Sequence, residues 1–187
     1  MTEQRSSGRP ATAAGRRWRT LPWPVAAALV LLLTAVAAPR GRAVEEPARR
    51  VILTVTGALD RAGADGSVDL TLEELERLGT VELVTTTPFT RGPVRFTGVL
   101  LRRLLEAVGA RGDVVHATAL NDYMVEIPRA DAARYDVVLA TRADGEPLPV
   151  RAKGPLWVVY PWSRHPELDS PLYGARSIWQ VRSLEIR

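Results

Sequence analysis

Cysteine is absent from this chain of 187 residues, and histidine occurs only at His116 and His165. The lack of cysteine excludes disulfide bonds, thiolate metal ligands and a cysteine nucleophile. The sequence also contains no H-E-x-x-H segment, no glycine-rich phosphate loop and no G-x-S-x-G motif. These are the signatures of zinc peptidases, nucleotide-binding loops and α/β-hydrolases. The chain therefore offers no motif-based support for any of these three classes.

Lysine is nearly absent as well, since Lys153 stands alone beside 24 arginines. The formal net charge is +4, but seven of the 25 basic residues and only one of the 21 acidic residues lie in residues 1–43. From Val44 onward, 18 basic and 20 acidic residues leave a net charge of about −2. A surface for DNA or RNA needs an excess of positive charge. The sequence therefore predicts no nucleic-acid partner.

The basic N-terminus precedes an apolar segment, residues 21–38. Two prolines near its start restrict the helical part to about residues 25–38, a length typical of the apolar region of a signal peptide. Small residues before Val44 predict cleavage at that point. We expect residues 1–43 to be a signal peptide or, if uncleaved, a membrane anchor. Residues 44–187 are then one domain, either periplasmic or secreted.

The pattern of apolar residues predicts seven or eight strands and two clear helices. The β-rich runs cover residues 51–56, 80–87, 113–120, 123–128, 136–142, 154–162 and 176–187. A capping box of Thr71 and Glu74 opens a short helix that Gly79 ends. Apolar residues at helical spacing predict the longest helix within residues 97–112, with Gly109 as its stop. The segment 163–175 is expected to be a polar loop.

Strands outnumber helices in this reading and do not alternate strictly with them. A doubly wound parallel sheet requires such an alternation. The sequence therefore predicts an α+β fold with a mixed or antiparallel sheet.

Two groups of polar residues are candidates for chemistry. Ser163, His165 and Asp169 are the residue types of a hydrolytic triad and lie close together in the sequence. The members of a triad must be positioned by a rigid scaffold, which a proline-containing loop does not provide. A polar surface loop is the favoured interpretation of that segment. Four basic side chains could line one anion-binding cleft. They are Arg142, Lys153, Arg164 and Arg176.

Several longer segments follow one another in a recognisable order. They are LTVTGAL, VDLTLEELERLGTVELVTTTPFTRGPVRFTGVLLRRLLEAVGA, ALNDYMVEIP, DVVLATRADGEPLPVRAKGPLWVVYP and IWQVRSLEI. This succession resembles the molybdopterin-binding domain of the sulfite oxidase family of oxidoreductases over about residues 50–187. The most specific parts are the Thr-rich loop with FTGVLLRRLLEAVG, the segment NDYMVEIP, and DGEPLPVRAKGPLWVVYP.

The resemblance implies an α+β fold with a mixed, partly barrel-like sheet and, in bacterial members, an exported setting. In catalytic members, a cysteine shortly after the second strand binds molybdenum through its thiolate. The matching position here lies within residues 85–87, with Thr86 as the best match. A threonine hydroxyl is a hard oxygen donor, whereas the family uses soft sulfur. The resemblance therefore implies a domain without the family's metal ligand, which argues against sulfite-oxidase catalysis.

Two functions of different classes remain open on the sequence. In the first, the domain binds molybdopterin. Any redox chemistry is then that of the cofactor, and a redox partner would exchange electrons with it. In the second, the same scaffold is a non-catalytic module that binds a small anionic ligand or a protein partner, beside a membrane signalling protein. The second uses Trp162 as a further pocket residue. The candidate cofactor-binding residues are Thr85, Thr86, Thr87, Arg91, Asn121, Tyr123, Arg142, Lys153 and Arg176.

Overall fold

The computed structural model describes residues 50–187. The expected signal peptide or membrane anchor, residues 1–43, lies outside the described residues. Among residues 50–187, no helix is long and apolar enough to cross a membrane.

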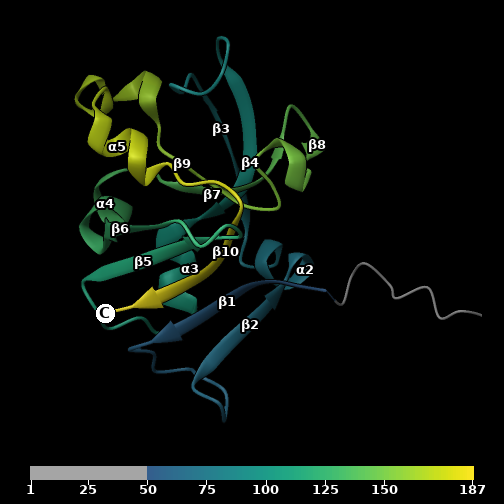
Figure 1. Cartoon of the computed structure of the whole chain (residues 1–187), viewed down its shortest axis with the longest axis vertical. Coiled ribbons are helices and arrows are strands. Elements are labelled where there is room, and N and C mark those ends of the chain that lie inside the picture. Colours follow the sequence, from purple (N-terminus) through teal and green to yellow (C-terminus); the bar gives the residue numbers. More distant parts are fainter. Residues whose placement is uncertain (1–49) are drawn as a thin grey trace, which may run out of the picture. The chain divides into compact units, whose positions relative to one another are not determined.

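The first of two sheets is mixed and has five strands. In spatial order they are β2 (Ser67–Thr71), β1 (Val51–Gly57), β10 (Val181–Ile186), β5 (Val114–Ala119) and β6 (Met124–Pro128). β1 and β10 pair in parallel, and the other neighbours pair antiparallel. The first and last strands of the described chain therefore lie side by side within one sheet (Figure 1).

The second sheet is antiparallel throughout. It contains β3 (Thr80–Thr85), β4 (Val94–Leu100), β7 (Val138–Ala143), β8 (Glu146–Pro147) and β9 (Trp157–Val159). β7 pairs with β4 along one edge and with both β8 and β9 along the other. β3 also contacts the segment Trp162–Arg164, which follows β9 in the chain.

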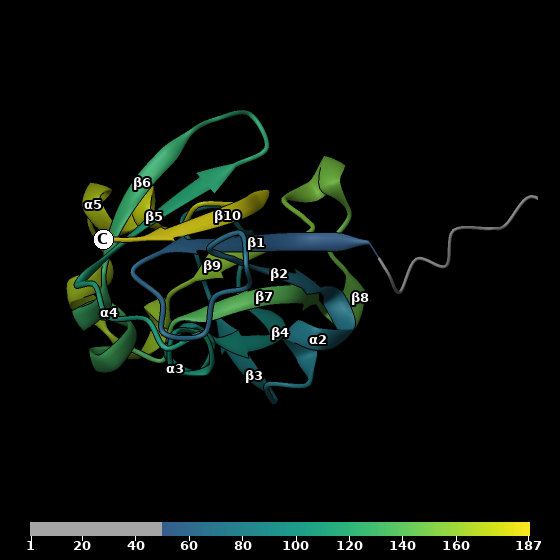
Figure 2. The ribbon, with the colours of Figure 1, turned by 90° about the horizontal axis from the view of Figure 1, so that it is seen from below.

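The helices are short. They are α2 (Leu72–Glu76), α3 (Leu101–Ala107), α4 (Arg129–Arg134) and α5 (Pro171–Arg176), with 3-10 turns η2 (Val150–Ala152), η3 (Trp162–Arg164) and η4 (Pro166–Leu168). The predicted capping box is confirmed, because Thr71 and Glu74 satisfy each other's backbone N–H groups at the start of α2. α4 and α5 both contact β6 and lie together near one end of it in both views (Figures 1 and 2).

Successive side chains of the second sheet face two different hydrophobic clusters. Leu139 of β7 and Val158 of β9 belong to the main cluster, which also contains the buried leucines of α3 and the inward residues of β1, β5 and β10. Their neighbours Val138 and Trp157 belong to a smaller cluster. This alternation follows from the two-residue period of a strand. The two sheets therefore pack as neighbouring layers (Figure 2).

The predicted fold class is confirmed, since the chain is an α+β protein with few short helices. The sequence also predicted a mixed sheet, and the first sheet is mixed. Within residues 50–187 the strands form two separate sheets and no closed barrel.

The predicted helix over residues 97–112 is wrong in its first four residues, and α3 ends at Ala107, two residues before the predicted stop at Gly109. Residues 97–100 continue β4, which pairs with β3 on one side and β7 on the other, and α3 begins only at Leu101. A Cβ atom at Gly98 would lie 2.2 Å from the carbonyl oxygen of Leu139, so only glycine allows this close approach. Pairing on both edges overrides the helical spacing of the leucines.

Several other elements differ from the sequence-based prediction. The segment 163–175, predicted to be a loop, contains most of η3, all of η4 and most of α5. The final strand begins at Val181 and not at residue 176. The strands β2, β4 and β8 were not predicted, because two of them are short and the third has a helical pattern.

Candidate ligand-binding site

Two threonines at the end of β3 are tied to the segment after β9 through Ser163. The Ser163 N–H donates to Thr85 Oγ1 at 2.9 Å, and the Thr86 N–H donates to Ser163 Oγ at 2.9 Å. The hydroxyls of Thr86 and Ser163 lie 3.1 Å apart. Thr85 is fully buried, whereas Thr86 is exposed. The first two predicted site threonines therefore join two distant segments of backbone.

The third predicted threonine, Thr87, closes a local turn. Its N–H donates to Thr90 Oγ1 at 3.0 Å, and its own Oγ1 accepts from the Phe89 N–H at 3.1 Å. The Thr90 N–H donates back to the Thr87 carbonyl at 3.2 Å. Such side-chain-to-backbone bonds stabilise tight turns. The turn holds Phe89 in place, and Arg91 follows it as an exposed residue.

A pocket of about 740 Å³ lies beside this turn. Three segments form it: the turn after β3, the turn between β5 and β6, and the stretch from the end of η4 through α5 toward β10. Its volume is within the range of small-molecule sites, roughly 300–1,000 Å³. The lining residues are Pro88, Phe89, Ala119, Asn121, Tyr123, Asp169, Ser170, Pro171, Gly174, Ala175, Ser177, Ile178 and Trp179.

Three aromatic side chains give the pocket much of its surface. The rings of Phe89 and Trp179 meet edge to face with centroids 5.0 Å apart, and each side chain is 37% exposed. Tyr123, from the turn between β5 and β6, is 49% exposed. The Tyr123 N–H donates to Oδ1 of Asn121 at 3.3 Å, which orders this turn. The predicted residues Asn121 and Tyr123 therefore lie together at the pocket.

The pocket lining contains neither lysine nor arginine, and Asp169 is its only acidic residue. Of the predicted basic residues, Lys153 comes near the pocket without lining it. Its ammonium lies 5.4 Å from the ring centroids of both Trp157 and Trp179. Lys153 thus contributes positive charge behind one aromatic wall.

The other predicted basic side chains lie elsewhere. Arg142 pairs with Glu76 of α2 at 3.3 Å, and Arg164 lines a separate pocket next to β3 and β4. Arg176 pairs with Asp131 of α4 at 2.9 Å. The structure therefore does not bring the four basic residues into one anion-binding cleft, contrary to the sequence-based prediction.

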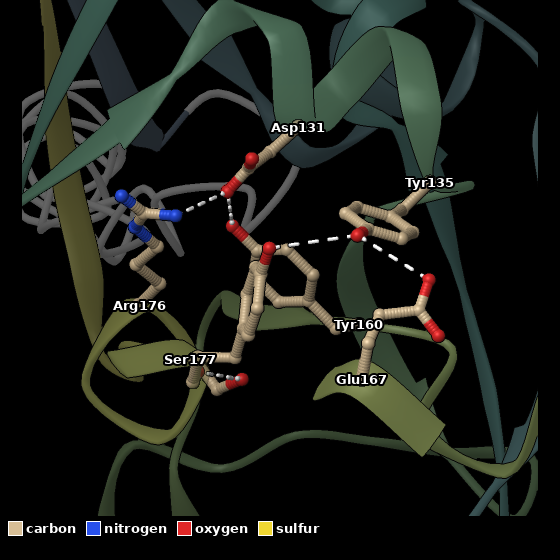
Figure 3. A network of polar contacts seen from close by, with 7 residues as sticks. Asp131, Tyr135, Tyr160, Glu167, Arg176 and Ser177 are labelled. Carbon is tan, nitrogen blue, oxygen red and sulfur yellow. Dashed lines mark hydrogen bonds and ion pairs between the residues drawn. The ribbon is translucent and has the colours of Figure 1, made fainter. Parts of the chain in front are cut away.

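Asp131 is the centre of a buried polar network behind the pocket wall (Figure 3). Its Oδ2 accepts from the Tyr160 hydroxyl at 2.8 Å and from Arg176 Nη1 at 2.9 Å. Burial, followed by the negative charge of Asp131, raises the pKa of Tyr160 above its ordinary value. The guanidinium of Arg176 also lies over the ring of Tyr173. This network fixes the C-terminal end of α5, whose Gly174 and Ala175 line the pocket.

Tyr135 extends the network toward η4. Its hydroxyl lies 3.5 Å from the hydroxyl of Tyr173 and 3.5 Å from Oε1 of Glu167. The contact with Tyr173, together with burial, raises the pKa of Tyr135 to about 12. Tyr135 is therefore a neutral hydrogen-bonding group at any physiological pH.

Ser163, His165 and Asp169, the candidate hydrolytic triad, do not contact one another. The hydroxyl of Ser163 bonds to Thr86, and Nδ1 of His165 lies 3.5 Å from Glu167. Asp169 instead lines the pocket. The geometry thus agrees with the interpretation that this segment is not a hydrolytic site.

Trp162 and His116 are buried in the fold and do not line the pocket. Trp162 is 9% exposed and lies in the main core cluster, not in the pocket. His116 of β5 is buried, with its Nε2 3.4 Å from Glu126. Neither residue contributes to the pocket lining.

Much of the pocket could not be found from the sequence. Its aromatic wall combines Phe89 with Trp179, and the residues after η4 were expected to be a polar loop. One signal for this stretch was the clustering of proline, serine and glycine before the tryptophan that ends residues 169–179. A second signal was the pair Asn121-Asp122, which alone separates the predicted strands over residues 113–120 and 123–128, because Asn-Asp pairs favour turns.

Comparison with known proteins gives one family. The profile described as the oxidoreductase molybdopterin binding domain matches residues 46–186. A search of the curated proteins found no match. Among solved structures, the sulfane dehydrogenase SoxCD from Paracoccus pantotrophus is similar, with a TM-score of 0.55 and 21% sequence identity. The similarity covers 75% of this chain but only 39% of that chain. Because the identity is low, the similarity shows the fold alone.

Proposed function

This chain belongs to the family of the oxidoreductase molybdopterin-binding domain, and we propose that it is an exported, non-catalytic member that binds a small organic ligand. The pocket of about 740 Å³ carries this proposal. It combines partly exposed aromatic rings with a few polar groups, which is the usual composition of a small-molecule site. It also lies next to the strand exit at which the family resemblance places the metal ligand.

The residues present do not fit a molybdenum centre. The best-matching ligand position, Thr86, offers a hydroxyl that lies 3.1 Å from Ser163 Oγ, and no thiolate is available in the chain. Residues 50–187 contain no group of three or more histidine, cysteine, aspartate or glutamate side chains that could hold a metal ion. The pocket lining also lacks a cation for the phosphate of a pterin. We therefore derive no reaction step through this cofactor.

Molybdopterin binding without catalysis is the second candidate. The family match over residues 46–186 supports it. In this case the phosphate of the pterin would meet Arg91, which is exposed after the turn that carries Phe89, or Lys153, whose ammonium lies 5.4 Å from the ring centroid of Trp179. Redox chemistry and a redox partner would then depend on the bound cofactor.

The proposed location and partner rest on the N-terminal sequence. A basic segment followed by the apolar residues 21–38 supports export to the periplasm or beyond, with anchoring if the segment is uncleaved. A ligand-binding domain at that place can pass information to a membrane signalling protein. Measuring the intact mass of the exported protein tests this point: cleavage before Val44 is expected, and a protein retained in the cytoplasm contradicts export.

The ligand-binding proposal is tested by filling the pocket. Ala175 is an exposed helical residue of the pocket lining, so Ala175→Trp fills the space without disturbing the core. We expect at least one compound of a metabolite panel to raise the melting temperature of the wild-type chain. The same compound should leave the melting temperature of Ala175→Trp unchanged, because ligand binding to the folded state is what stabilises it.

The matched control is Ala130→Trp. Ala130 is also an exposed alanine in a short helix, α4, but it does not line the pocket. This variant should keep the full ligand-induced shift. A panel that raises no melting temperature, or a shift that survives in Ala175→Trp, would contradict the proposed function.

A further inference from the structure

The charge of the pocket lining restricts the class of ligand, on the premise that the proposed ligand-binding function holds. Of the 13 lining residues, Asp169 alone carries a formal charge, and it is negative. An anionic ligand would be partly desolvated beside this carboxylate without a lining cation to balance it. A neutral or positively charged ligand meets no such penalty. The lining therefore disfavours the anionic ligand predicted from the sequence.

The aromatic residues indicate the shape of the ligand. Phe89, Tyr123 and Trp179 remain between 37% and 49% exposed, although large aromatic side chains gain free energy when buried. Together with Ile178, which also lines the pocket, they offer faces and edges for a flat ring. A planar aromatic group is the occupant that covers such surfaces best.

Asp169 offers a place for a positive charge. Its side chain makes no hydrogen bond or ion pair with any residue in the part of the chain that the structure describes. The ring of Trp179 is already engaged by the ammonium of Lys153, 5.4 Å from its centroid. A second cation is therefore better placed near Asp169 and the electron-rich ring of Tyr123 than over Trp179.

We propose that the pocket binds an arylalkylamine, a ligand with a flat aromatic ring and a protonated amine on a short alkyl chain. The flat ring lies against Phe89 and Trp179, and the protonated amine lies near Asp169. This assignment deepens the proposed function by naming a ligand class. It differs from the family's phosphorylated cofactor in the sign of its charge.

Three indole compounds test the assignment, because they share a ring and differ in charge. Tryptamine is cationic, 3-methylindole is neutral and indole-3-acetate is anionic. Isothermal titration calorimetry with the full chain, purified after export, should show the tightest binding for tryptamine. We expect roughly fivefold weaker binding of 3-methylindole, the effect of one partly exposed charge contact, and at least tenfold weaker binding of indole-3-acetate.

Two variants separate charge from packing. Asp169→Asn should make tryptamine and 3-methylindole bind equally well, within about twofold. Asp113→Asn is the matched control, since Asp113 is an exposed aspartate outside the pocket lining, and it should keep the preference for tryptamine. Phe89→Ala should weaken the binding of both compounds alike. Phe89 is partly exposed, so this variant is expected to fold.

The ligand class would be overturned if indole-3-acetate bound as tightly as tryptamine, or if Asp169→Asn kept the preference for the amine. The proposed ligand class would also be wrong if tryptamine did not bind at millimolar concentration. A different compound that stabilises the wild type and not Ala175→Trp would then show that the proposed function stands and that only the ligand class is wrong. Failure of every compound in both experiments would remove both proposals.

Discussion

Thr85 shows how a residue type that often binds ligands can serve the fold instead. Its side chain is fully buried, and its hydroxyl accepts the N–H of Ser163 at 2.9 Å. A buried polar group must be hydrogen-bonded, because leaving it unpaired costs about 1–3 kcal/mol. The Thr-rich segment therefore stabilises the junction between β3 and η3, and the pocket lies beside that junction.

Replacing Thr85 by valine tests this role. Thr85→Val keeps the branched shape but leaves the N–H of Ser163 without its acceptor. We expect the free energy of unfolding to fall by about 1–2 kcal/mol, measured by urea denaturation.

Thr118→Val is the control for this substitution. Thr118 is a half-buried threonine of β5, and its side chain makes no hydrogen bond with the described residues. Its replacement should change stability by less than about 0.5 kcal/mol. Equal effects of the two variants would mean that the bond to Ser163 does not stabilise the junction.

A second residue-scale prediction concerns Asp131. Its side chain is 11% exposed and that of its partner Arg176 is 17% exposed, so the ion pair is largely screened from water. Asp131→Asn leaves a buried guanidinium unpaired, and we expect a loss of about 2–4 kcal/mol of stability. Because Arg176 fixes α5, ligand binding should weaken as well.

The control is Asp136→Asn. Asp136 pairs with Arg102 at the surface, where both side chains are more than a third exposed. Such a pair contributes at most about 1 kcal/mol. If Asp131→Asn were no more destabilising than Asp136→Asn, the buried network would not be what holds the wall of the pocket.

At the scale of the elements, α2 is the one whose start the sequence predicts in detail. Thr71 and Glu74 form the expected capping box, because the two side chains lie three residues apart and each reaches the other's backbone. α3 was predicted only in part. Its leucines continue the apolar pattern of β4, and no local signal separates a strand that is paired on both edges from a helix.

The capping box makes part of the stability depend on pH. The backbone N–H of Thr71, and then its hydroxyl, hold the pKa of Glu74 below its ordinary value of 4.5. A folded-state pKa below the unfolded one means that this stabilisation is present above about pH 4.5 and is lost as the pH falls through the folded value.

Glu74→Gln tests the sign of this dependence. The variant should be less stable than the wild type at neutral pH, and the difference should shrink at about pH 3. Glu106→Gln, at an exposed position of α3 outside any capping box, controls for the loss of a surface charge. A deficit in Glu74→Gln that is independent of pH would contradict the assigned pKa shift.

At the scale of the whole molecule, local patterns were enough for the fold class but not for the site. The strands β1, β3, β5, β6 and β7 follow runs of β-branched residues, and their order resembles that of a known family. The pocket is lined by Phe89, Tyr123 and Trp179, which come from three segments that only the folded chain brings together. The same holds for the pairing of Arg176 with Asp131, which removes a predicted anion-binding cation from the pocket.

We propose that the pocket of this chain binds a small organic ligand and does not hold molybdenum. The most direct test is the molybdenum and pterin content of the full chain, purified after export from a bacterial host that makes the cofactor. The account predicts neither molybdenum nor pterin in stoichiometric amount. It also predicts that Thr86→Cys alone gains none, because the pocket lining still lacks a cation for the phosphate. One molybdenum and one pterin per wild-type chain would contradict the account.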